Sequence, residues 1–500
     1  MLPQIWPVTC HTDYVGPNST FVAIKGQQSD GLAYLPTALA RGATKIVVAQ
    51  ESILTPEILA QLAAKAVELI RVANPRQALS NLSAAAWGYP AQKLKIIAVT
   101  GTKGKTTSAY CLKQLLSSLG HRTALLSGVQ NIIDQQALPA DLTTPQPDFL
   151  QMFLAQCVQA QIEYVVMEAA AQGFSLHRLD DVQFTAAIFT NLEQEHAEFY
   201  ANLDDYFAAK CQLLNRLLPG APVIFNYDND WSRQALALAQ AQGLNARSFS
   251  LQAESALLVD YVIKLQQAGT NGLELEFLAN DCVQPGDRAQ DKLCPRVTDS
   301  AALVLRAPNL WGQFNAYNLA GVLACLAELG FDLTQLVVPV TSLIAAPGRL
   351  ERYQLANGAS AVIDYAHTPS SFKALLSLLR TLTPDLIVVF GASGDRDPFK
   401  RPLMGQIAAQ LADCVIITTD NPRTEDATKI WQAVYAGVLP ADQAKVRIEP
   451  DRALAIALAA SLCQPQSIMA VLGKGPDEYQ IFGREKTFFS DRQEVLKACY

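Results

Sequence analysis

The chain has 500 residues, which is more than one hydrophobic core can organise, and this length predicts about three domains. Hydrophobic residues make up 50% of the sequence and charged residues 17%, a composition that is typical of a compact enzyme and excludes a disordered chain. The formal net charge of -7 argues against a nucleic-acid-binding surface. Because no apolar run reaches membrane-spanning length and the first residues lack the features of a signal peptide, we expect a cytoplasmic protein without membrane insertion. The ten cysteines are scattered without a C-x-x-C pair and predict buried, reduced thiols.

The segment up to Pro90 has the pattern of a small α/β unit. Residues 20–24 and 45–49 are short runs that are typical of strands. The alanine-rich residues 72–87 predict a helix, which the breaker residues that follow would end. We therefore predict that the first domain ends at residue 91.

A phosphate-binding loop is indicated by residues 95–107, K-I-I-A-V-T-G-T-K-G-K-T-T. An apolar run typical of a buried parallel strand leads into a glycine-containing turn, and a helix-compatible segment follows. Gly101 and Gly104 allow backbone N–H groups to approach an anion closely. Lys105 offers a charge for the outer phosphates, and the Thr106 hydroxyl is suited to Mg²⁺. The strict motif has one more glycine, replaced here by valine, so an ordinary strand-to-helix turn is the alternative.

Charged side chains follow the next predicted strands. The apolar residues 162–167 end at Glu168, and an acid at the carboxyl end of a buried parallel strand lies where α/β sheets bind ligands. Glu168 is therefore a candidate Mg²⁺ ligand. A second strand at residues 186–190 leads towards His196, which is either a ligand or an ordinary loop histidine. Lys210 lies in a helical stretch, and a helical lysine is usually a solvated surface charge.

The last part of the chain alternates strands with helices, which predicts a doubly wound α/β unit. The predicted strands are residues 361–363, 386–390 and 415–418, and the predicted helices are residues 371–382 and 403–411. The glycines at residues 391–394 lack the G-x-G-x-x-G spacing, so we exclude a dinucleotide site. The sequence D-N-P-R at residues 420–423 follows the third strand, at the edge where such sheets bind ligands.

Seven ordered motifs resemble those of the Mur ligases, the ATP-dependent amide-forming enzymes of peptidoglycan precursor synthesis, and the resemblance spans essentially the whole chain. They are residues 100–107, Met167-Glu168, residues 190–192, Tyr206-x-x-x-Lys210, residues 312–318, residues 346–351 and residues 364–369. Within this family the chain resembles the UDP-N-acetylmuramoyl-tripeptide synthetases, because of residues 21–31 and 391–426. The resemblance implies an α/β fold of three domains. These are a small N-terminal α/β domain for the UDP substrate (1–91), a central P-loop ATPase-like parallel-sheet domain (92–346) and a C-terminal Rossmann-like domain for the amino acid (347–500).

The resemblance also implies a mechanism and its residues. In the family, ATP phosphorylates a substrate carboxylate, and an incoming amine attacks the acyl phosphate. Lys105, His196 and Lys210 match catalytic positions, and Lys210 is expected to carry a carbamate formed from CO₂. The expected ligands of Mg²⁺ are Thr106, Glu168, His196 and carbamylated Lys210. The expected ATP-binding residues are Gly101, Thr102, Lys103, Gly104, Lys105, Thr106, Thr107, Asn315, Arg349 and Asp364.

The substrate side follows from the same resemblance. The residues expected to bind the UDP-N-acetylmuramoyl-dipeptide are Thr12, Gln27, Gln28, Ser29, Thr143, Thr144, Ala170 and Arg178. The residues expected to bind the amino acid are Arg401, Asp420, Asn421, Pro422, Arg423, Gly473 and Asp477. The D-N-P-R sequence resembles the version that accepts meso-diaminopimelate, because an arginine fork can bind the additional carboxylate of that donor in a bidentate manner. The alternative is that Arg423 pairs with Glu425 or Asp426 in a surface turn.

The chain departs from the family pattern mainly on the UDP side. The family's D-S-R near the N-terminus is His11-Thr12-Asp13 here, and the serine pair after Met167-Glu168 is Ala170-Ala171. The last amino-acid contact is Asp477 after proline, where the family has glutamate after histidine. Of the first motif only the hydroxyl at Thr12 survives, and one hydroxyl expected near the muramoyl substrate is missing, whereas the ATP and metal side is intact.

Three functions are compatible with these motifs. We expect an ATP-dependent ligase of cell-wall biogenesis, acting as a monomer, that adds meso-diaminopimelate to UDP-N-acetylmuramoyl-L-alanyl-D-glutamate. The second function is the same reaction with lysine or another diamine as donor. The third is a non-catalytic nucleotide-binding paralogue that regulates wall synthesis, although the presence of Lys105, Glu168, His196 and Lys210 favours a working enzyme. Folylpolyglutamate synthetases share the phosphate loop, but residues 26–31 and 420–423 argue against them.

Overall fold

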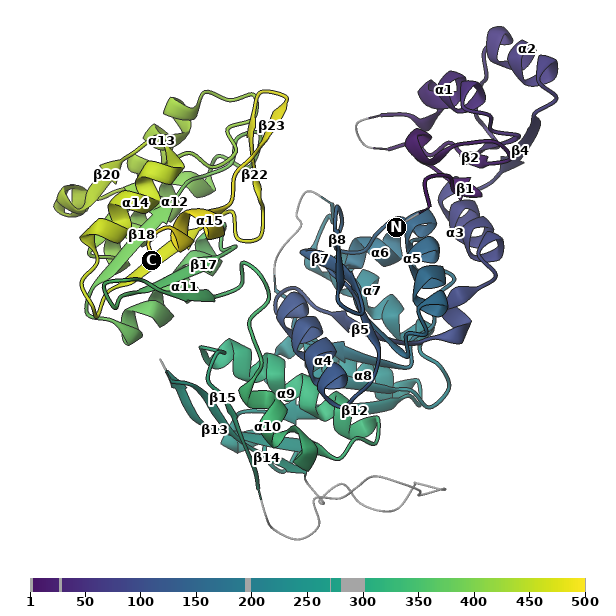
Figure 1. Cartoon of the computed structure of the whole chain (residues 1–500). Helices are drawn as coiled ribbons and strands as arrows, with labels where there is room; N and C mark the ends of the chain where they lie inside the picture. The colour runs from purple at the N-terminus through teal and green to yellow at the C-terminus, as the bar shows by residue number, and fades with distance from the viewer. Residues whose placement is uncertain (1–2, 27–28, 194–198, 270, 280–301, 500) are drawn as a thin grey trace. The chain divides into compact units, whose positions relative to one another are not determined.

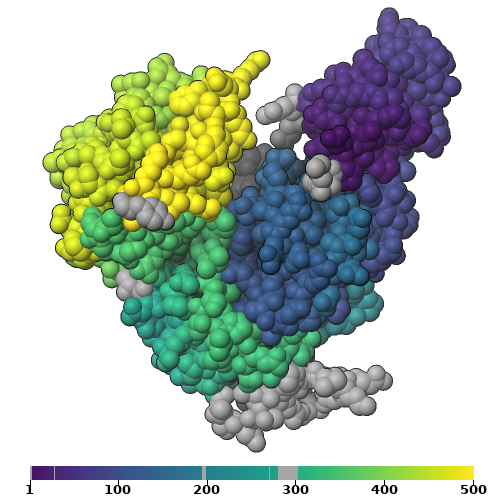
Figure 2. All heavy atoms as spheres, in the orientation of Figure 1, coloured from purple at the N-terminus to yellow at the C-terminus, as the bar shows by residue number. Residues whose placement is uncertain are grey.

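The computed structural model describes residues 3–26, 29–193, 199–269, 271–279 and 302–499 (Figure 1). They form two compact units, one of residues 1–265, 275–305 and 314–340, and one of residues 266–274, 306–313 and 341–500. Most of the second unit has the green to yellow colours in Figure 2. None of the described helices combines the length and the hydrophobicity that a membrane span requires.

A four-stranded parallel sheet begins the chain, in the order β1-β2-β3-β4. Its strands are β1 (Val8–Thr9), β2 (Thr20–Val22), β3 (Lys45–Ala49) and β4 (Glu68–Val72), and its helices are α1 (Leu35–Ala40), α2 (Pro56–Ala64) and α3 (Pro75–Ala86). The small α/β unit is confirmed. The helix predicted for residues 72–87 begins at Pro75, three residues later than predicted, because Val72 belongs to β4. Asn74 caps α3 by accepting from the N–H groups of Arg76 and Gln77.

The second sheet has eleven strands, and β5 (Lys95–Thr100) lies inside it between β10 (Ala186–Phe189) and β9 (Tyr164–Glu168). Every β5 residue after Lys95 is buried, which explains the continuous apolar run that predicted a parallel strand. The other strands are β6 (Thr123–Leu126), β7 (Gln130–Ile133), β8 (Gln136–Pro139), β11 (Pro222–Asn226), β12 (Asn245–Ser250), β13 (Tyr261–Gly269), β14 (Gly272–Ala279) and β15 (Leu303–Ala307). The helices are α4 (Lys105–Ser118), α5 (Pro147–Gln159), α6 (Ala171–Ser175), α7 (Leu203–Cys211), α8 (Asp230–Ala241), α9 (Gln313–Glu328) and α10 (Val337–Thr341).

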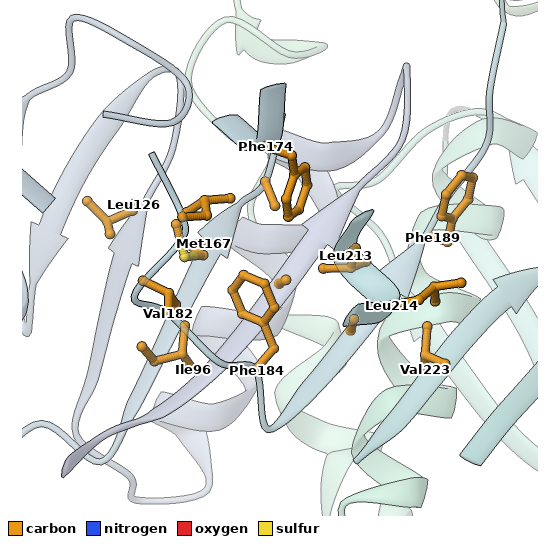
Figure 3. Close-up of a cluster of buried hydrophobic side chains, with 14 of the residues drawn as sticks. Ile96, Leu126, Met167, Phe174, Val182, Phe184, Phe189, Leu213, Leu214 and Val223 are labelled. Carbon is orange, nitrogen blue, oxygen red and sulfur yellow. The ribbon is translucent and has the colours of Figure 1, made fainter. Parts of the chain in front are cut away.

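A dense apolar cluster covers one face of this sheet (Figure 3). Ile96, Met167 and Phe189 enter it from the three central strands, and Phe184 and Phe174 join them from the segments between the strands. All of these side chains are at most 3% exposed. This packing holds the ends of β5, β9 and β10 in fixed relative positions, and the predicted site residues follow those ends.

The third sheet has the order β16-β17-β21-β18-β19-β20, and only β16 in it runs antiparallel to its neighbour. The strands are β16 (Glu351–Gln354), β17 (Ser360–Asp364), β18 (Leu386–Phe390), β19 (Cys414–Ile417), β20 (Val446–Ile448) and β21 (Ile468–Leu472). The helices are α11 (Pro369–Leu382), α12 (Lys400–Leu411), α13 (Ala427–Tyr435), α14 (Arg452–Leu462) and α15 (Asp491–Leu496).

Alternate residues of β18 enter two separate cores. Val388 packs in the cluster that contains Phe372 of α11, and Val389 packs in the cluster that contains Ile456 of α14. Because successive side chains of a strand point to opposite faces, helices must cover both faces of this sheet. The doubly wound α/β unit is confirmed, and β18 has the predicted bounds. The predicted domain ends at residues 91 and 346 stay predictions.

A fully buried ion pair lies at the end of β21. The side chains of Arg452 and Asp491 have no exposed surface, and their two hydrogen bonds, from Nε and Nη2 to the carboxylate, are both 2.7 Å long. Arg452 Nη2 also donates to the carbonyl of Leu472 at 3.0 Å, directly before Gly473. The pair therefore ties α14 and α15 to the end of a central strand.

We expect Asp491→Ala to lower the free energy of unfolding of the second unit by about 3–5 kcal/mol, because it leaves a buried guanidinium without its counterion. The double variant Arg452→Met/Asp491→Leu should recover most of this loss. Urea titration of the full chain, followed by hydrogen exchange at the β21 amides, measures the change. Arg380→Gln is the control, since it breaks an exposed pair with Asp413 and should change stability by about 0–1 kcal/mol. A loss in Asp491→Ala no larger than that of the control would contradict the assignment.

Candidate active site

The turn between β5 and α4 depends on two glycines. Gly101 has φ 137° and Gly104 has φ 84°, backbone conformations that favour glycine. A Cβ atom on Gly101 would lie 2.0 Å from Thr190 Oγ1, and one on Gly104 would lie 2.1 Å from Asn318 Oδ1. Both glycines therefore allow close packing as well as an unusual backbone. The turn leads directly into α4, whose first N–H groups form the anion-binding end of a helix.

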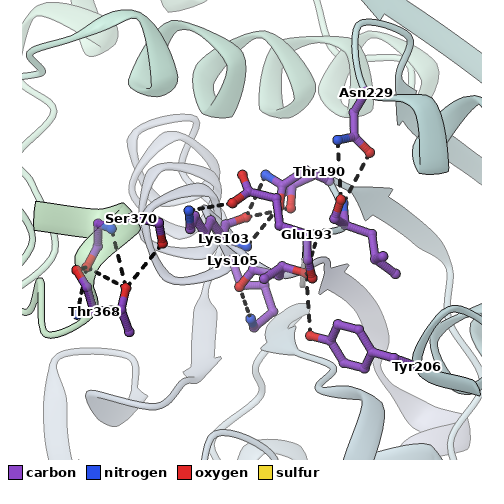
Figure 4. Close-up of polar contacts among 12 residues, drawn as sticks. Lys103, Lys105, Thr190, Glu193, Tyr206, Asn229, Thr368 and Ser370 are labelled. Carbon is purple, nitrogen blue, oxygen red and sulfur yellow. Dashed lines mark hydrogen bonds and ion pairs between the residues drawn. The ribbon is translucent and has the colours of Figure 1, made fainter. Parts of the chain in front are cut away.

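Two lysines of this loop make different contacts (Figure 4). Lys105 Nζ donates to the carbonyls of Gly101 and Thr102, each at 2.9 Å. Lys103 Nζ instead forms an ion pair with Glu193. The ammonium of Lys105 is thus held over the loop by main-chain oxygens, where a phosphate group would contact it. Thr102 and Thr107 lie on either side of it along the chain.

The loop is braced by the segment that follows β10. Thr190 Oγ1 donates to the Lys103 carbonyl at 2.7 Å. Asn191 accepts from Lys103 N at 2.9 Å and donates to Lys103 O at 3.1 Å, and Asn229 in turn accepts from Leu192 N at 3.2 Å. Figure 4 shows Thr190 and Asn229 beside the loop. Residues 190–192 form one of the sequence motifs, but their bracing role was not predicted, because it depends on contacts between distant segments.

Glu168 and Thr106 both present oxygen atoms near the phosphate loop. Glu168 is the last residue of β9, pairs with Val99 of β5 and is 1% exposed. One of its carboxylate oxygens accepts from Gly128 N at 3.0 Å, which fixes the orientation of the side chain. Thr106 is buried in the first turn of α4. Carboxylate and hydroxyl oxygens suit Mg²⁺, so these two residues fit the expected ion.

The other two expected metal ligands are His196 and Lys210. His196 lies outside the described residues. Across the parts of the chain that the structure describes, no group of three or more His, Cys, Asp and Glu side chains could hold a metal ion. The predicted set also uses a hydroxyl and a modified lysine, so it does not require such a group.

Lys210 is buried, so its interpretation as a surface charge is wrong. The residue lies near the end of α7 and is 1% exposed. Its Nζ donates to Gly101 O at 2.7 Å and lies 4.6 Å from the centroid of the Tyr206 ring. Lys210 and Lys105 therefore converge on the same carbonyl oxygen of the phosphate loop.

The predicted UDP-side residues of the central sheet lie together. Arg178 Nη1 donates to Thr144 O at 2.7 Å, and Thr144 Oγ1 donates to Glu168 O at 2.8 Å and accepts from Ala170 N at 2.9 Å. Burial, together with the nearby charge of Arg76, lowers the pKa of Arg178 to about 10. Its Nε has no hydrogen-bond partner among the described residues. These contacts connect the predicted substrate side to the main chain of Glu168, whose carboxylate is expected to bind metal.

The N-terminal part of the predicted UDP site is described only in part. Thr12 is half-buried and Ser29 is exposed, whereas Gln27 and Gln28 lie outside the described residues. Asp148 of α5 accepts from Thr9 Oγ1 at 2.9 Å and from Cys10 N at 3.0 Å. This carboxylate ties the loop that carries Thr12 to the central sheet. Thr143 lies beside Gly128, where a Cβ on the glycine would be 2.8 Å from its Oγ1.

The three predicted ATP residues outside the loop belong to different units. Asn315 of α9 is 3% exposed, and its Oδ1 accepts from Asn318 Nδ2 at 3.0 Å. Asn318 is the residue that packs against Gly104, so Asn315 lies one contact away from the phosphate loop. Arg349 and Asp364 lie in the second unit.

Arg349 and Asp364 are brought together by a tight turn. Asp364 accepts from Leu350 N and Ala366 N, each at 2.8 Å. Burial raises the pKa of the Asp364 carboxyl, although Arg349 and these N–H groups act in the opposite direction. The Arg349 guanidinium lies 5.0 Å from the centroid of the Tyr365 ring, and its Nε has no hydrogen-bond partner within the described chain.

The D-N-P-R turn (residues 420–423) follows β19, and its arginine, Arg423, forms no ion pair among the described residues. Asp420 and Asn421 are each 4% exposed. Arg423 has φ 54°, and its Nε is buried without a hydrogen-bond partner in the part of the chain that is described. Among the described residues, Arg423 forms no ion pair with Glu425 or Asp426, which was the alternative. Glu425 pairs with Arg401 instead, and Asp426 caps α13.

Arg401 is already engaged. Its two terminal nitrogens donate to Glu425 at 2.9 and 2.8 Å, and the residue is 4% exposed. A substrate carboxylate would have to compete with Glu425, so the predicted contact between Arg401 and the amino acid stays a prediction. Arg396, in the loop before α12, is exposed and was not predicted from the sequence.

Two carboxylates complete this end of the third sheet. A Cβ on Gly473, which has φ 105°, would lie 3.0 Å from Asp420 Oδ2. Burial raises the pKa of the Asp477 carboxyl, although the nearby charge of Lys474 acts in the opposite direction. Lys474, which was not predicted from the sequence, is 1% exposed and lies 3.5 Å from Asn421 Oδ1. Acidic and basic groups thus surround the turn, an arrangement suited to a ligand that carries both charges.

The fold and these sites define a nucleotide-binding protein with a P-loop sheet and a second, doubly wound sheet. Its sequence matches the Mur ligase middle domain over residues 99–326 and the Mur ligase glutamate ligase domain over residues 348–475. The chain belongs to the Mur ligase family of ATP-dependent ligases.

Similar proteins support this assignment. The chain is 34% identical to the UDP-N-acetylmuramoyl-L-alanyl-D-glutamate–2,6-diaminopimelate ligase of Synechococcus elongatus, covering 96% of this chain and 91% of the relative. It is 32% identical to the ligase of the same name from Parabacteroides distasonis, covering 96% and 92%. A solved structure of a ligase with this name has a TM-score of 0.65 and 27% identity, covering 99% of this chain and 94% of that one. Folylpolyglutamate synthase from Thermotoga maritima shares the fold, with a TM-score of 0.60, 14% identity and coverage of 80% and 89%.

We expect Gly104→Ala to weaken ATP binding by at least about tenfold, because the added methyl group meets Asn318 in addition to the strain of a left-handed backbone. Gly120→Ala is the matched control, since Gly120 has φ 89° but no atom lies within 4 Å of the position that its Cβ would take. Calorimetric titration with ATP and Mg²⁺ measures the affinity. The double variant Gly104→Ala/Asn318→Ala should recover part of it. Equal affinities in the two single variants would show that close packing at Gly104 is unimportant.

Proposed function

We propose that this Mur ligase is a cytoplasmic enzyme that adds meso-diaminopimelate to UDP-N-acetylmuramoyl-L-alanyl-D-glutamate in peptidoglycan synthesis. The observation that carries the proposal is Arg423, whose guanidinium has no carboxylate partner in the described chain although it lies beside a cluster of charged groups. The named activity of the relatives supports the same donor.

The charges around the D-N-P-R turn match the chemistry of this donor. Diaminopimelate differs from lysine by an additional carboxylate on its distal carbon. Arg423 can bind that carboxylate with two parallel hydrogen bonds, which a lysine donor could not accept. Asp420 and Asp477 offer acceptors for an ammonium group. Asp477 is shorter than the glutamate that the family pattern has, but it keeps a carboxylate beside Lys474.

The phosphate loop supplies the binding of ATP. The N–H groups at the start of α4 and the ammonium of Lys105 would contact the phosphates, and the bracing residues Thr190 and Asn191 hold the loop in place. Thr106 and Glu168 would hold Mg²⁺, which offsets the negative charge of the phosphates when it is bound. The terminal phosphoryl group of ATP passes to a substrate carboxylate, which leaves ADP and an acyl phosphate. The amine of the donor then attacks the acyl carbon, and phosphate leaves as the amide bond forms.

Lys210 is proposed to carry a carbamate that binds a second Mg²⁺. Its nitrogen is buried next to the phosphate loop, where an ammonium would add to the positive charge of Lys105. Addition of CO₂ to the amine, with loss of a proton, converts the side chain into an anionic oxygen ligand. Burial at this position supports a role inside the site rather than on the surface.

We expect Arg423→Ala to reduce kcat/KM for meso-diaminopimelate by about thirty- to a thousand-fold, because the distal carboxylate would lose a charge-assisted contact. Activity with lysine should change far less. Arg484→Ala is the control, since Arg484 is exposed in the turn between β22 (Tyr479–Phe482) and β23 (Glu485–Phe488). Steady-state phosphate release with both donors measures the effect. If the wild type prefers lysine, or if the variant loses activity equally with both donors, the alternative function with lysine as donor is favoured.

We expect Lys210→Ala to abolish ligation at ambient CO₂ and a short-chain carboxylic acid to restore part of the activity, because the acid can replace the carbamate oxygens. Lys113→Ala is the control, since Lys113 also lies on a helix and donates to a main-chain carbonyl, that of Asp134. Single-turnover assays and intact-mass measurement under ¹³CO₂ test the modification. Full activity of unrescued Lys210→Ala would exclude the carbamate role.

A further inference from the structure

A two-stranded hairpin is attached to the D-N-P-R turn. It consists of β22 (Tyr479–Phe482) and β23 (Glu485–Phe488), which form a separate sheet. Its connections to the turn are Gln480 Nε2 to Thr419 O at 3.2 Å and to Asp420 O at 3.1 Å, Ile481 N to Asn421 Oδ1 at 3.0 Å, Arg423 N to Ile481 O at 3.0 Å, and Gly483 N to Arg423 O at 2.7 Å. The main chain and the side chains of the turn are therefore both held from the same hairpin.

The hairpin maintains an unfavourable backbone conformation at Arg423. A non-glycine residue in the left-handed region is strained, and this conformation persists only where the surroundings determine it. At Arg423 the determining contacts are the N–H donated to Ile481 and the carbonyl that accepts from Gly483. Without them, the backbone of Arg423 would relax to negative φ and its side chain would leave its present direction.

The direction of that side chain matters because its guanidinium is not anchored by an acid. Its Nε is buried and has no hydrogen-bond partner among the described residues, and neighbouring Glu425 is occupied by Arg401. The backbone conformation therefore sets the direction in which the side chain leaves the turn. A guanidinium held in advance binds a carboxylate with less loss of conformational freedom.

Gln480 is the side chain through which the hairpin holds the start of the turn. Its amide spans two consecutive carbonyls, those of Thr419 and Asp420, directly after β19. Asn421 completes the attachment from the other side by accepting from Ile481 N. A residue without an N–H donor in its side chain at position 480 would leave both carbonyls without this contact.

We propose that Gln480 is a positioning residue for donor selection: its side chain anchors the hairpin whose main chain holds Arg423 in its left-handed conformation, and the enzyme therefore favours a diamino acid with a second carboxylate. The inference rests on the proposed function for the identity of the donor. Gln480 itself does not touch the reacting atoms in this scheme. Its loss should therefore affect the KM for a donor with a distal carboxylate much more than kcat.

The experiment compares Gln480→Met with Gln354→Met. Gln354 is a matched control because its Nε2 also donates to two main-chain carbonyls, those of Gly358 at 2.6 Å and Ala359 at 3.0 Å, in the same unit. Gln480→Met should lower the ratio of kcat/KM for meso-diaminopimelate to that for lysine by about 5- to 30-fold, mainly through KM. Gln354→Met should leave the ratio unchanged. Equal losses with both donors, or an unchanged ratio, would overturn the proposal.

Hydrogen exchange at the amides of Arg423 and Gly483 gives a second readout that needs no substrate. Both amides should exchange at least about tenfold faster in Gln480→Met than in wild type or in Gln354→Met. If wild type does not prefer meso-diaminopimelate, the proposed function fails, and exchange alone decides the positioning role. Unchanged protection of the two amides would then refute it. Should Gln480→Met not fold, Gln480→Asn replaces that variant in both measurements. Its side chain keeps an amide but is too short to span both carbonyls.

Discussion

The carbonyl of Gly101 is the point on which the ATP side depends. Two lysine ammonium groups, those of Lys105 and Lys210, donate to this single oxygen at 2.9 and 2.7 Å. Their nitrogens therefore lie within about 6 Å of each other, a distance at which two positive charges interact appreciably. A bound triphosphate would add negative charge at this place, and the proposed carbamate on Lys210 would remove one positive charge.

The sequence predicted those features that depend on neighbouring residues. The apolar run of β18 specified the strand to its last residue, and the glycines around Lys105 specified the phosphate loop. The ion pair between Arg401 and Glu425 could not be predicted, because it joins residues 24 positions apart, and it decides that Glu425 does not pair with Arg423. Lys210 shows the same limit, since a helical pattern does not specify whether its amine is exposed.

The chain lacks a serine pair after Glu168, and the structure gives a physical account of what remains there. Thr144 bonds both to the carbonyl of Glu168 and to the N–H of Ala170, so the backbone after β9 is fixed by a hydroxyl from another segment. Arg178 in turn holds the carbonyl of Thr144. The geometry around the carboxylate is therefore maintained although the local hydroxyl groups are absent.

The attachment of the hairpin to the D-N-P-R turn has a consequence for exchanging donor preference between ligases. The contact between Asn421 and Ile481 joins residues 60 positions apart in the sequence. A four-residue segment moved into another ligase would carry Arg423 but not the partners that determine its backbone. The proposed donor recognition by Arg423 therefore involves two coupled segments, and we expect that only a graft that includes both would transfer it.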